Sequence, residues 1–273
     1  MTIDSRSRPR IGSAGLGVIA LLSALSLIVA ACSSSSTSAP TSTTPPLSGA
    51  ITVSAASSLS KVFTSLATSF EAVHHGTSLR FNFGSSGALA TQIVEGAPSD
   101  VFAAAAAAPM AEVQAAGDLA ESPTTFARNS LEIVVKPGNP LGIHGLGDLP
   151  RVHVVALCVL TAPCGANAAE VLTRARVNLL PTGVTRGPDV DATLAQVTTG
   201  DADAAIVYVT NAATVGTTAV GVAIPKSQNA VTSYPIAVLR TTSDPQLARA
   251  WMAYVLGPVG VRALLQAHFL PPS

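Results

Sequence analysis

Aromatic and charged side chains are scarce in this chain of 273 residues, at 4% and 11% of the sequence. The 15 basic residues balance the 15 acidic ones, and no basic patch stands out along the chain. This pattern argues against a nucleic-acid partner, because such proteins carry clustered lysine and arginine. With 48% hydrophobic residues and few large rings, the helices are expected to pack closely through alanine and other small side chains.

Charge is also missing from residues 11–31, an apolar run that follows three arginines in the first ten residues. A basic start, an apolar stretch and small residues before Cys32 are typical of a secretory signal peptide over residues 1–31. The cysteine directly after two alanines resembles that of a bacterial lipobox, which predicts lipidation of Cys32. A single transmembrane helix is the alternative, but the glycine and serine within the run and the terminal cysteine favour the signal peptide.

Residues 32–48 contain almost nothing apolar after the cysteine and are mostly serine, threonine and proline. Such a segment cannot bury a core, so we expect a disordered tether. Without residues 1–31, the chain keeps 12 basic and 14 acidic residues, a net charge of −2. The remaining ~225 residues suffice for one large domain or two small ones.

Cysteine is rare, and only Cys158 and Cys164 follow the predicted anchor. Neither these cysteines nor the five scattered histidines have the spacing of metal ligands, so no protein-bound metal ion is predicted. An exported chain meets an oxidising environment, where two nearby cysteines can form a disulfide. Two free buried thiols are the alternative, and the sequence alone leaves both open.

Strand and helix patterns alternate along the rest of the chain. This alternation predicts an α/β fold with parallel sheets and helices on both faces. Ligands of such folds bind beyond the carboxyl ends of the strands, at helix N-termini. The predicted strands are 51–53, 79–83, 100–103, 131–135, 152–157, 204–208, 220–223 and 236–239. The predicted helices begin near residues 58, 88, 109, 163, 189, 245 and 258.

Two serine-bearing turns each lie between a predicted strand and a predicted helix: residues 54–59 (SAASSL) and 84–87 (GSSG). The first N–H groups of a helix have no intrahelical acceptor, and the helix dipole is positive there. Such a place binds an anion without lysine or arginine. The residues alone also allow Ser58 and Ser86 to be ordinary helix N-caps.

Further segments follow in order: GAPSDVF at 96–102, IVY at 206–208 and YPIAV at 234–238. From about residue 50 to its end, the chain resembles the molybdate-binding component of bacterial ABC importers, the ModA family. The resemblance implies a two-lobed periplasmic-binding-protein fold of type II, with parallel-rich mixed sheets and a ligand cleft between the lobes. Residues 49–130 plus 234–273 would form lobe I, and residues 131–233 lobe II.

The resemblance also implies an oxyanion site made of hydroxyls and backbone N–H groups from both lobes. The corresponding residues here are Ser58, Ser86, Cys164, Val190 and Tyr208. Tyr208 on its own could equally be a core tyrosine bonded to backbone. Cys164 stands where the family often has alanine, and residues 103–108 are all alanine where an acidic residue is usual. Molybdenum would enter only as bound molybdate, and no cofactor is implied.

These expectations describe a lipoprotein on the outer face of the cell membrane, a monomer that captures molybdate or tungstate for an ABC permease and its ATPase. The first alternative keeps the fold and binds another oxyanion, such as sulfate or phosphate. The second is an enzyme: Ser58 and Lys61 fit the S-x-x-K pattern of penicillin-recognising serine enzymes. The sequence has neither the K-T-G nor the S-D-N motif of those enzymes, so a non-enzymatic binding protein is the favoured hypothesis.

Overall fold

The computed structural model describes residues 46–273 of the chain. Its first sheet segment combines strands from the beginning and from the later part of this range. Strand β1 (Gly49–Ala56) lies parallel to β2 (Thr77–Gly84) and β3 (Val101–Ala103). Strand β3 in turn pairs antiparallel with β9 (Val231–Val238). The predicted signal peptide and Cys32 lie outside the described residues.

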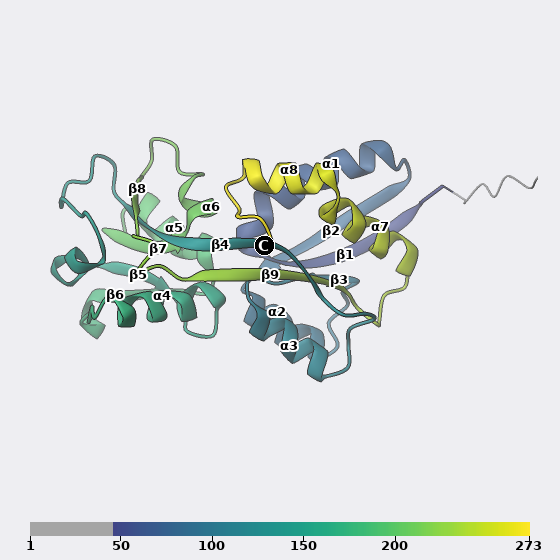
Figure 1. The fold of residues 1–273 in the computed structure, drawn as a ribbon, viewed down its shortest axis with the longest axis horizontal. Coiled ribbons are helices and arrows are strands. Elements are labelled where there is room, and N and C mark those ends of the chain that lie inside the picture. Colours follow the sequence, from purple (N-terminus) through teal and green to yellow (C-terminus); the bar gives the residue numbers. More distant parts are fainter. Residues whose placement is uncertain (1–45) are drawn as a thin grey trace, which may run out of the picture. The chain divides into compact units, whose positions relative to one another are not determined.

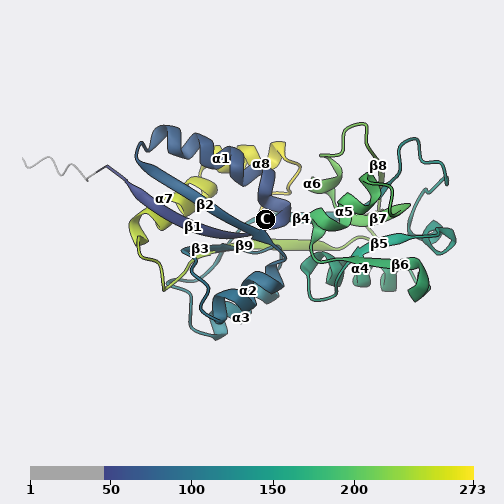
Figure 2. The same ribbon diagram turned by 180° about the vertical axis from the view of Figure 1, so that it is seen from behind.

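Helices cover both faces of this segment (Figures 1 and 2). One face carries α1 (Ser60–Val73), α7 (Pro245–Leu256) and α8 (Pro258–Gln266), and the other carries α2 (Ser86–Val94) and α3 (Ala107–Ala115). Several of the few aromatic residues gather under the first face. Trp251 is fully buried there and packs edge-on against the rings of Phe63 and Phe70.

Strand β4 (Thr124–Val135) connects the first sheet segment to the second. Residues 124–130 pair with β9, whereas residues 131–135 pair with β7 (Ala204–Tyr208) and β8 (Val220–Ala223). The sequence predicted only residues 131–135, because the residues before them are mostly polar and lack an apolar pattern. Their strand conformation comes from pairing with β9, a long-range contact.

The second sheet segment places β5 (Val155–Cys158) between β6 (Val184–Gly187) and β7, both in parallel. Helix α4 (Pro163–Arg174) covers one face, and α5 (Val190–Thr198) with α6 (Val209–Ala212) covers the other (Figure 2). The sequence did not predict β6 or α6, since each has only four residues and half or more of them are polar or glycine, which leaves no apolar pattern.

The complete strand order is β2-β1-β3-β9-β4-β7-β5-β6, with β8 paired to β4. Short 3-10 helices occur at Ser57–Leu59, Leu146–Arg151 and Pro181–Gly183. The predicted α/β class with a mixed sheet is confirmed, but the sheet is not rich in parallel pairs: among the described strands, four pairs are parallel and four are antiparallel. Within residues 46–273, no helix is both long and apolar enough to cross a membrane.

Candidate functional site

Helices α2, α4 and α5 and the 3-10 helix Ser57–Leu59 begin around one small cavity at the junction of the two sheet segments. The cavity has about 200 Å³ of space free of protein atoms, part of it open to solvent. All five residues proposed from the sequence line it, namely Ser58, Ser86, Cys164, Val190 and Tyr208. The other lining residues are Ala56, Ser57, Gly84, Ser85, Ala105, Ala162, Pro163 and Asp189.

The lining is rich in hydrogen-bond donors and contains no lysine or arginine. Helices α2, α4 and α5 begin at Ser86, Pro163 and Val190, so their free N–H groups and positive dipole ends meet at the cavity. The charged side chain in the lining is Asp189, and its Oδ1 accepts the N–H of Ala192 at 2.9 Å as the cap of α5. Such a set of donors suits a small anion.

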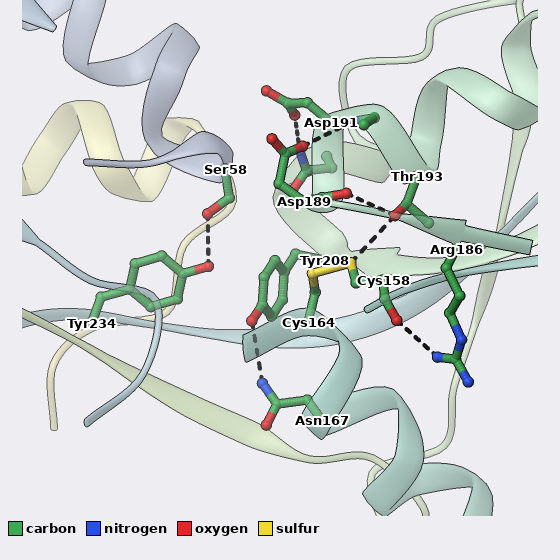
Figure 3. Close-up of a disulfide and its surroundings, with 12 residues drawn as sticks. Ser58, Cys158, Cys164, Asn167, Arg186, Asp189, Asp191, Thr193, Tyr208 and Tyr234 are labelled. Carbon is green, nitrogen blue, oxygen red and sulfur yellow. Dashed lines mark hydrogen bonds between the residues drawn. A yellow bond between two sulfur atoms is a disulfide. The ribbon is translucent and has the colours of Figure 1, made fainter. Parts of the chain in front are cut away.

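Ser58 is held by a chain of side chains that begins outside the cavity, and Figure 3 shows its last link, between Tyr234 and Ser58. The Nδ2 group of Asn129 lies 3.3 Å from the Tyr234 hydroxyl, which lies 2.9 Å from Ser58 Oγ. Because an amide nitrogen only donates, Tyr234 accepts from Asn129 and has its own proton free for Ser58. The Ser58 O–H is then free to donate toward the cavity. Sequence reasoning missed this role of Tyr234, which lies 176 positions from Ser58.

Ser86 has a comparable arrangement. Its Oγ accepts the backbone N–H of Ala105 at 2.9 Å, and the residue is buried. The hydroxyl proton therefore remains available to a ligand. Neither Ser86 nor Ser58 is an N-cap: the caps are Ser85 for α2 and Ala56 for the 3-10 helix, and no side-chain cap bond forms at either. The alternative that both serines are ordinary N-caps is wrong.

Tyr208 is the last residue of β7 and is buried. It lines the cavity on the side opposite Ser58 and Ser86. Its hydroxyl accepts from Asn167 Nδ2 at 3.2 Å, which leaves its own proton free (Figure 3). The hydrogen-bond partner of Tyr208 is thus the Asn167 side chain, whereas a core tyrosine was expected to bond to a backbone group. Burial raises the pKa of Tyr208 well above its ordinary value of 10.0, and burial raises the pKa of Tyr234 as well. Both hydroxyls therefore stay protonated donors at neutral pH.

A disulfide joins Cys158 at the end of β5 to Cys164 at the start of α4 (Figure 3). Of the two alternatives from the sequence, the structure has the bridge. The backbone of α4 at Gly165 also lies close to the backbone after β5, because a Cβ on Gly165 would lie 2.0 Å from the carbonyl oxygen of Val159. The first turn of α4, with the N–H of Cys164, is thus fixed against the strand that precedes it.

The geometry gives no support to the enzyme alternative. The hydroxyl of Ser58 is hydrogen-bonded to Tyr234, and no hydrogen bond joins Ser58 to Lys61 within the described part of the chain. Lys61 is exposed and forms no salt bridge among residues 46–273. A nucleophilic serine needs a base within hydrogen-bond reach.

Comparison with known proteins agrees with this geometry. Residues 51–270 match the family described as bacterial extracellular solute-binding protein. A curated relative, the molybdate-binding protein ModA of Mycobacterium tuberculosis (strain ATCC 25618 / H37Rv), is 40% identical over 248 residues, which cover 90% of this chain and 93% of that protein.

Solved structures show the same fold. The periplasmic molybdate-binding protein of Azotobacter vinelandii superposes with a TM-score of 0.72 at 22% identity, covering 82% of this chain and all of the other. The sulfate-binding protein SubI of Mycobacterium tuberculosis H37Rv superposes with a TM-score of 0.73 at 20% identity, covering 81% and 86%. The predicted two-lobed periplasmic-binding-protein fold is confirmed.

Proposed function

The chain belongs to the family of bacterial extracellular solute-binding proteins, and on that premise we propose that it captures molybdate outside the cytoplasm for an ABC importer. The observation that carries the proposal is the cavity that brings Ser58, Ser86, Cys164, Val190 and Tyr208 together without a cationic side chain. Molybdate near neutral pH is a fully ionised tetrahedral dianion, which needs donors and no acceptor.

The binding energy has an adequate source. A hydrogen bond to a charged group contributes about 1.5–3 kcal/mol. The hydroxyls of Ser58, Ser86 and Tyr208 and the N–H groups at the helix starts supply several such bonds. Submicromolar affinity is then within reach after the costs of ordering and closure.

We further propose that lobe I comprises residues 49–130 plus 234–273 and lobe II residues 131–233. The change of partner within β4, from β9 up to Ser130 to β7 from Leu131 onward, supports this division. The proposed donors then come from both lobes: Ser58 and Ser86 from lobe I, and Cys164, Val190 and Tyr208 from lobe II. An anion held by both sets would favour closure.

Phosphate is the second candidate, because one carboxylate does line the cavity. Monohydrogen phosphate carries a proton and favours a site with an acceptor. Asp189 Oδ1 already accepts from Ala192, but its other oxygen has no hydrogen bond within residues 46–273. Molybdate remains the favoured ligand because every other lining side chain is either apolar or a hydroxyl with a proton to donate, and because the ModA relative is named for it.

Calorimetry on the mature protein tests the choice of ligand. We expect one site for molybdate and a similar one for tungstate, which has nearly the same size. Sulfate and phosphate should bind far more weakly, because a smaller tetrahedron cannot reach the donors of both lobes together. Tight phosphate binding that disappears in Asp189→Asn would replace molybdate by phosphate as the ligand.

We also propose that Cys32 carries a lipid that anchors a monomeric protein to the outer face of the cell membrane, where it serves a permease and a cytosolic ATPase. The small residues before Cys32 and the polar tether after it support this proposal. Cys32→Ala should move the protein from the membrane fraction to the soluble fraction, as measured by immunoblotting. A cleaved variant that stays with the membrane would contradict the anchor.

A further inference from the structure

A hydrogen bond between the first turns of α1 and α5 joins the two lobes outside the oxyanion cavity. The hydroxyl of Ser60 donates to Asp191 Oδ2 at 3.2 Å. Ser60 begins α1, two residues after Ser58, and Asp191 is the second residue of α5, directly after Val190. The contact therefore connects the lobes immediately beside two proposed binding residues.

A hydrogen bond within lobe II positions the Asp191 carboxylate for this contact. Its Oδ1 accepts Asn211 Nδ2 at 2.6 Å, and Asn211 is a buried residue of α6. Partial desolvation raises the pKa of Asp191, and the neighbouring Asp189 raises it further, whereas Ser60, Lys61 and Asn211 act in the opposite direction. A desolvated carboxylate depends on its donors, so Ser60 completes a set that lobe II supplies only in part.

The contact lies in the wall of a second, larger cavity with about 660 Å³ of space free of protein atoms, part of it open to solvent. Ser60 and Asp191 line it together with Ser58, which also faces the oxyanion cavity. The charged or titratable groups that face Asp191 there are Lys61 on α1 and His268 near the C-terminus, both exposed. The lobes meet here through a hydrogen bond at the wall of a cavity rather than through a packed apolar interface.

We propose that Ser60, Asp191 and Asn211 form an interlobe bridge that keeps the lobes closed over a bound oxyanion, an inference that rests on the proposed function. None of the three lines the oxyanion cavity, so they are positioning residues. The Ser60–Asp191 bond exists only when the lobes meet, and it stabilises the closed complex relative to the open one. Its loss should therefore accelerate release of the anion.

The test is a double-mutant cycle on the rate of anion release. The full-length protein is loaded with radiolabelled molybdate, tungstate, sulfate or phosphate, whichever binds the wild type most tightly, and is chased with unlabelled anion. Ser60→Ala and Asp191→Ala should each release the anion about three- to tenfold faster, the range expected for one partly exposed hydrogen bond. The double variant should be no faster than the faster single one, and Ser60→Thr, which keeps the hydroxyl, should restore the wild-type rate.

Two variants serve as matched controls. Ser69→Ala removes an exposed hydroxyl of α1 that bonds only within its own helix, and Asp201→Ala removes an exposed carboxylate after α5. Both should release at the wild-type rate. If the effects of Ser60→Ala and Asp191→Ala on the release rate are additive, or if both variants release the anion at the wild-type rate, the proposed bridge is wrong. Failure of molybdate itself to bind would instead overturn the proposed ligand, since the cycle is then run with the anion that does bind.

Discussion

Replacing Gly87 by alanine is expected to lower the affinity for molybdate about ten- to hundredfold, the range of an overpacked contact that costs about 1–3 kcal/mol. Gly87 is the second residue of α2 in lobe I, and a Cβ built on it lies 2.4 Å from the backbone oxygen of Thr161. Thr161 precedes α4 in lobe II. Closure leaves no room for the methyl group, so the lobes of the variant must stay further apart.

The stability of the ligand-free protein separates this effect from simple misfolding. Alanine is a better helix former than glycine by about 1 kcal/mol, so Gly87→Ala should melt at or above the wild-type temperature while it binds more weakly. Gly147→Ala is the matched control, because a Cβ there meets no atom within 4 Å. Calorimetric titration and thermal melting check both variants. Wild-type affinity in Gly87→Ala would contradict a closed site at this position.

Ser86→Ala should also weaken molybdate binding about ten- to hundredfold, since one hydrogen bond to a charged group is lost. The same change leaves the N–H of Ala105 without its acceptor in a buried position. An unsatisfied buried donor costs about 1–3 kcal/mol, so the melting temperature should fall as well. Affinity and stability thus decrease together, unlike in Gly87→Ala.

Ser58→Ala is the informative comparison, and Ser69→Ala on the surface of α1 is the control. Ser58 is hydrogen-bonded to Tyr234, and Tyr234 keeps Asn129 as a partner after the change. We therefore expect a similar loss of affinity with a smaller loss of stability. Wild-type affinity in both serine variants would remove these hydroxyls from the site.

Those parts of the site that depend on local order could be predicted from the sequence. Ser58 and Ser86 each lie where a strand passes into a helix, and that local pattern alone directs N–H groups and hydroxyls to one end of a strand. The roles of Tyr234 and Asn167 could not be found in this way. Both act on hydroxyls far away in sequence, Ser58 and Tyr208, and nothing in their local sequence marks these contacts.

The same distinction holds for the fold. Helices α7 and α8 were predicted from residues 245 and 258, where a proline begins each helix. The first half of β4 was missed, because its polar residues adopt strand conformation through pairing with β9. Asp189 was correctly interpreted as a helix-start residue, but its place in the cavity lining depends on how the lobes meet.

The proposed oxyanion site is tested most directly by the position of molybdenum in crystals of the molybdate complex, located by its anomalous scattering. We expect one molybdenum peak in the cavity, with anion oxygens within hydrogen-bond distance of Ser58, Ser86 and Tyr208 and of the N–H groups of Cys164 and Val190. A peak elsewhere on the protein, or an anion that contacts only one lobe, would contradict it.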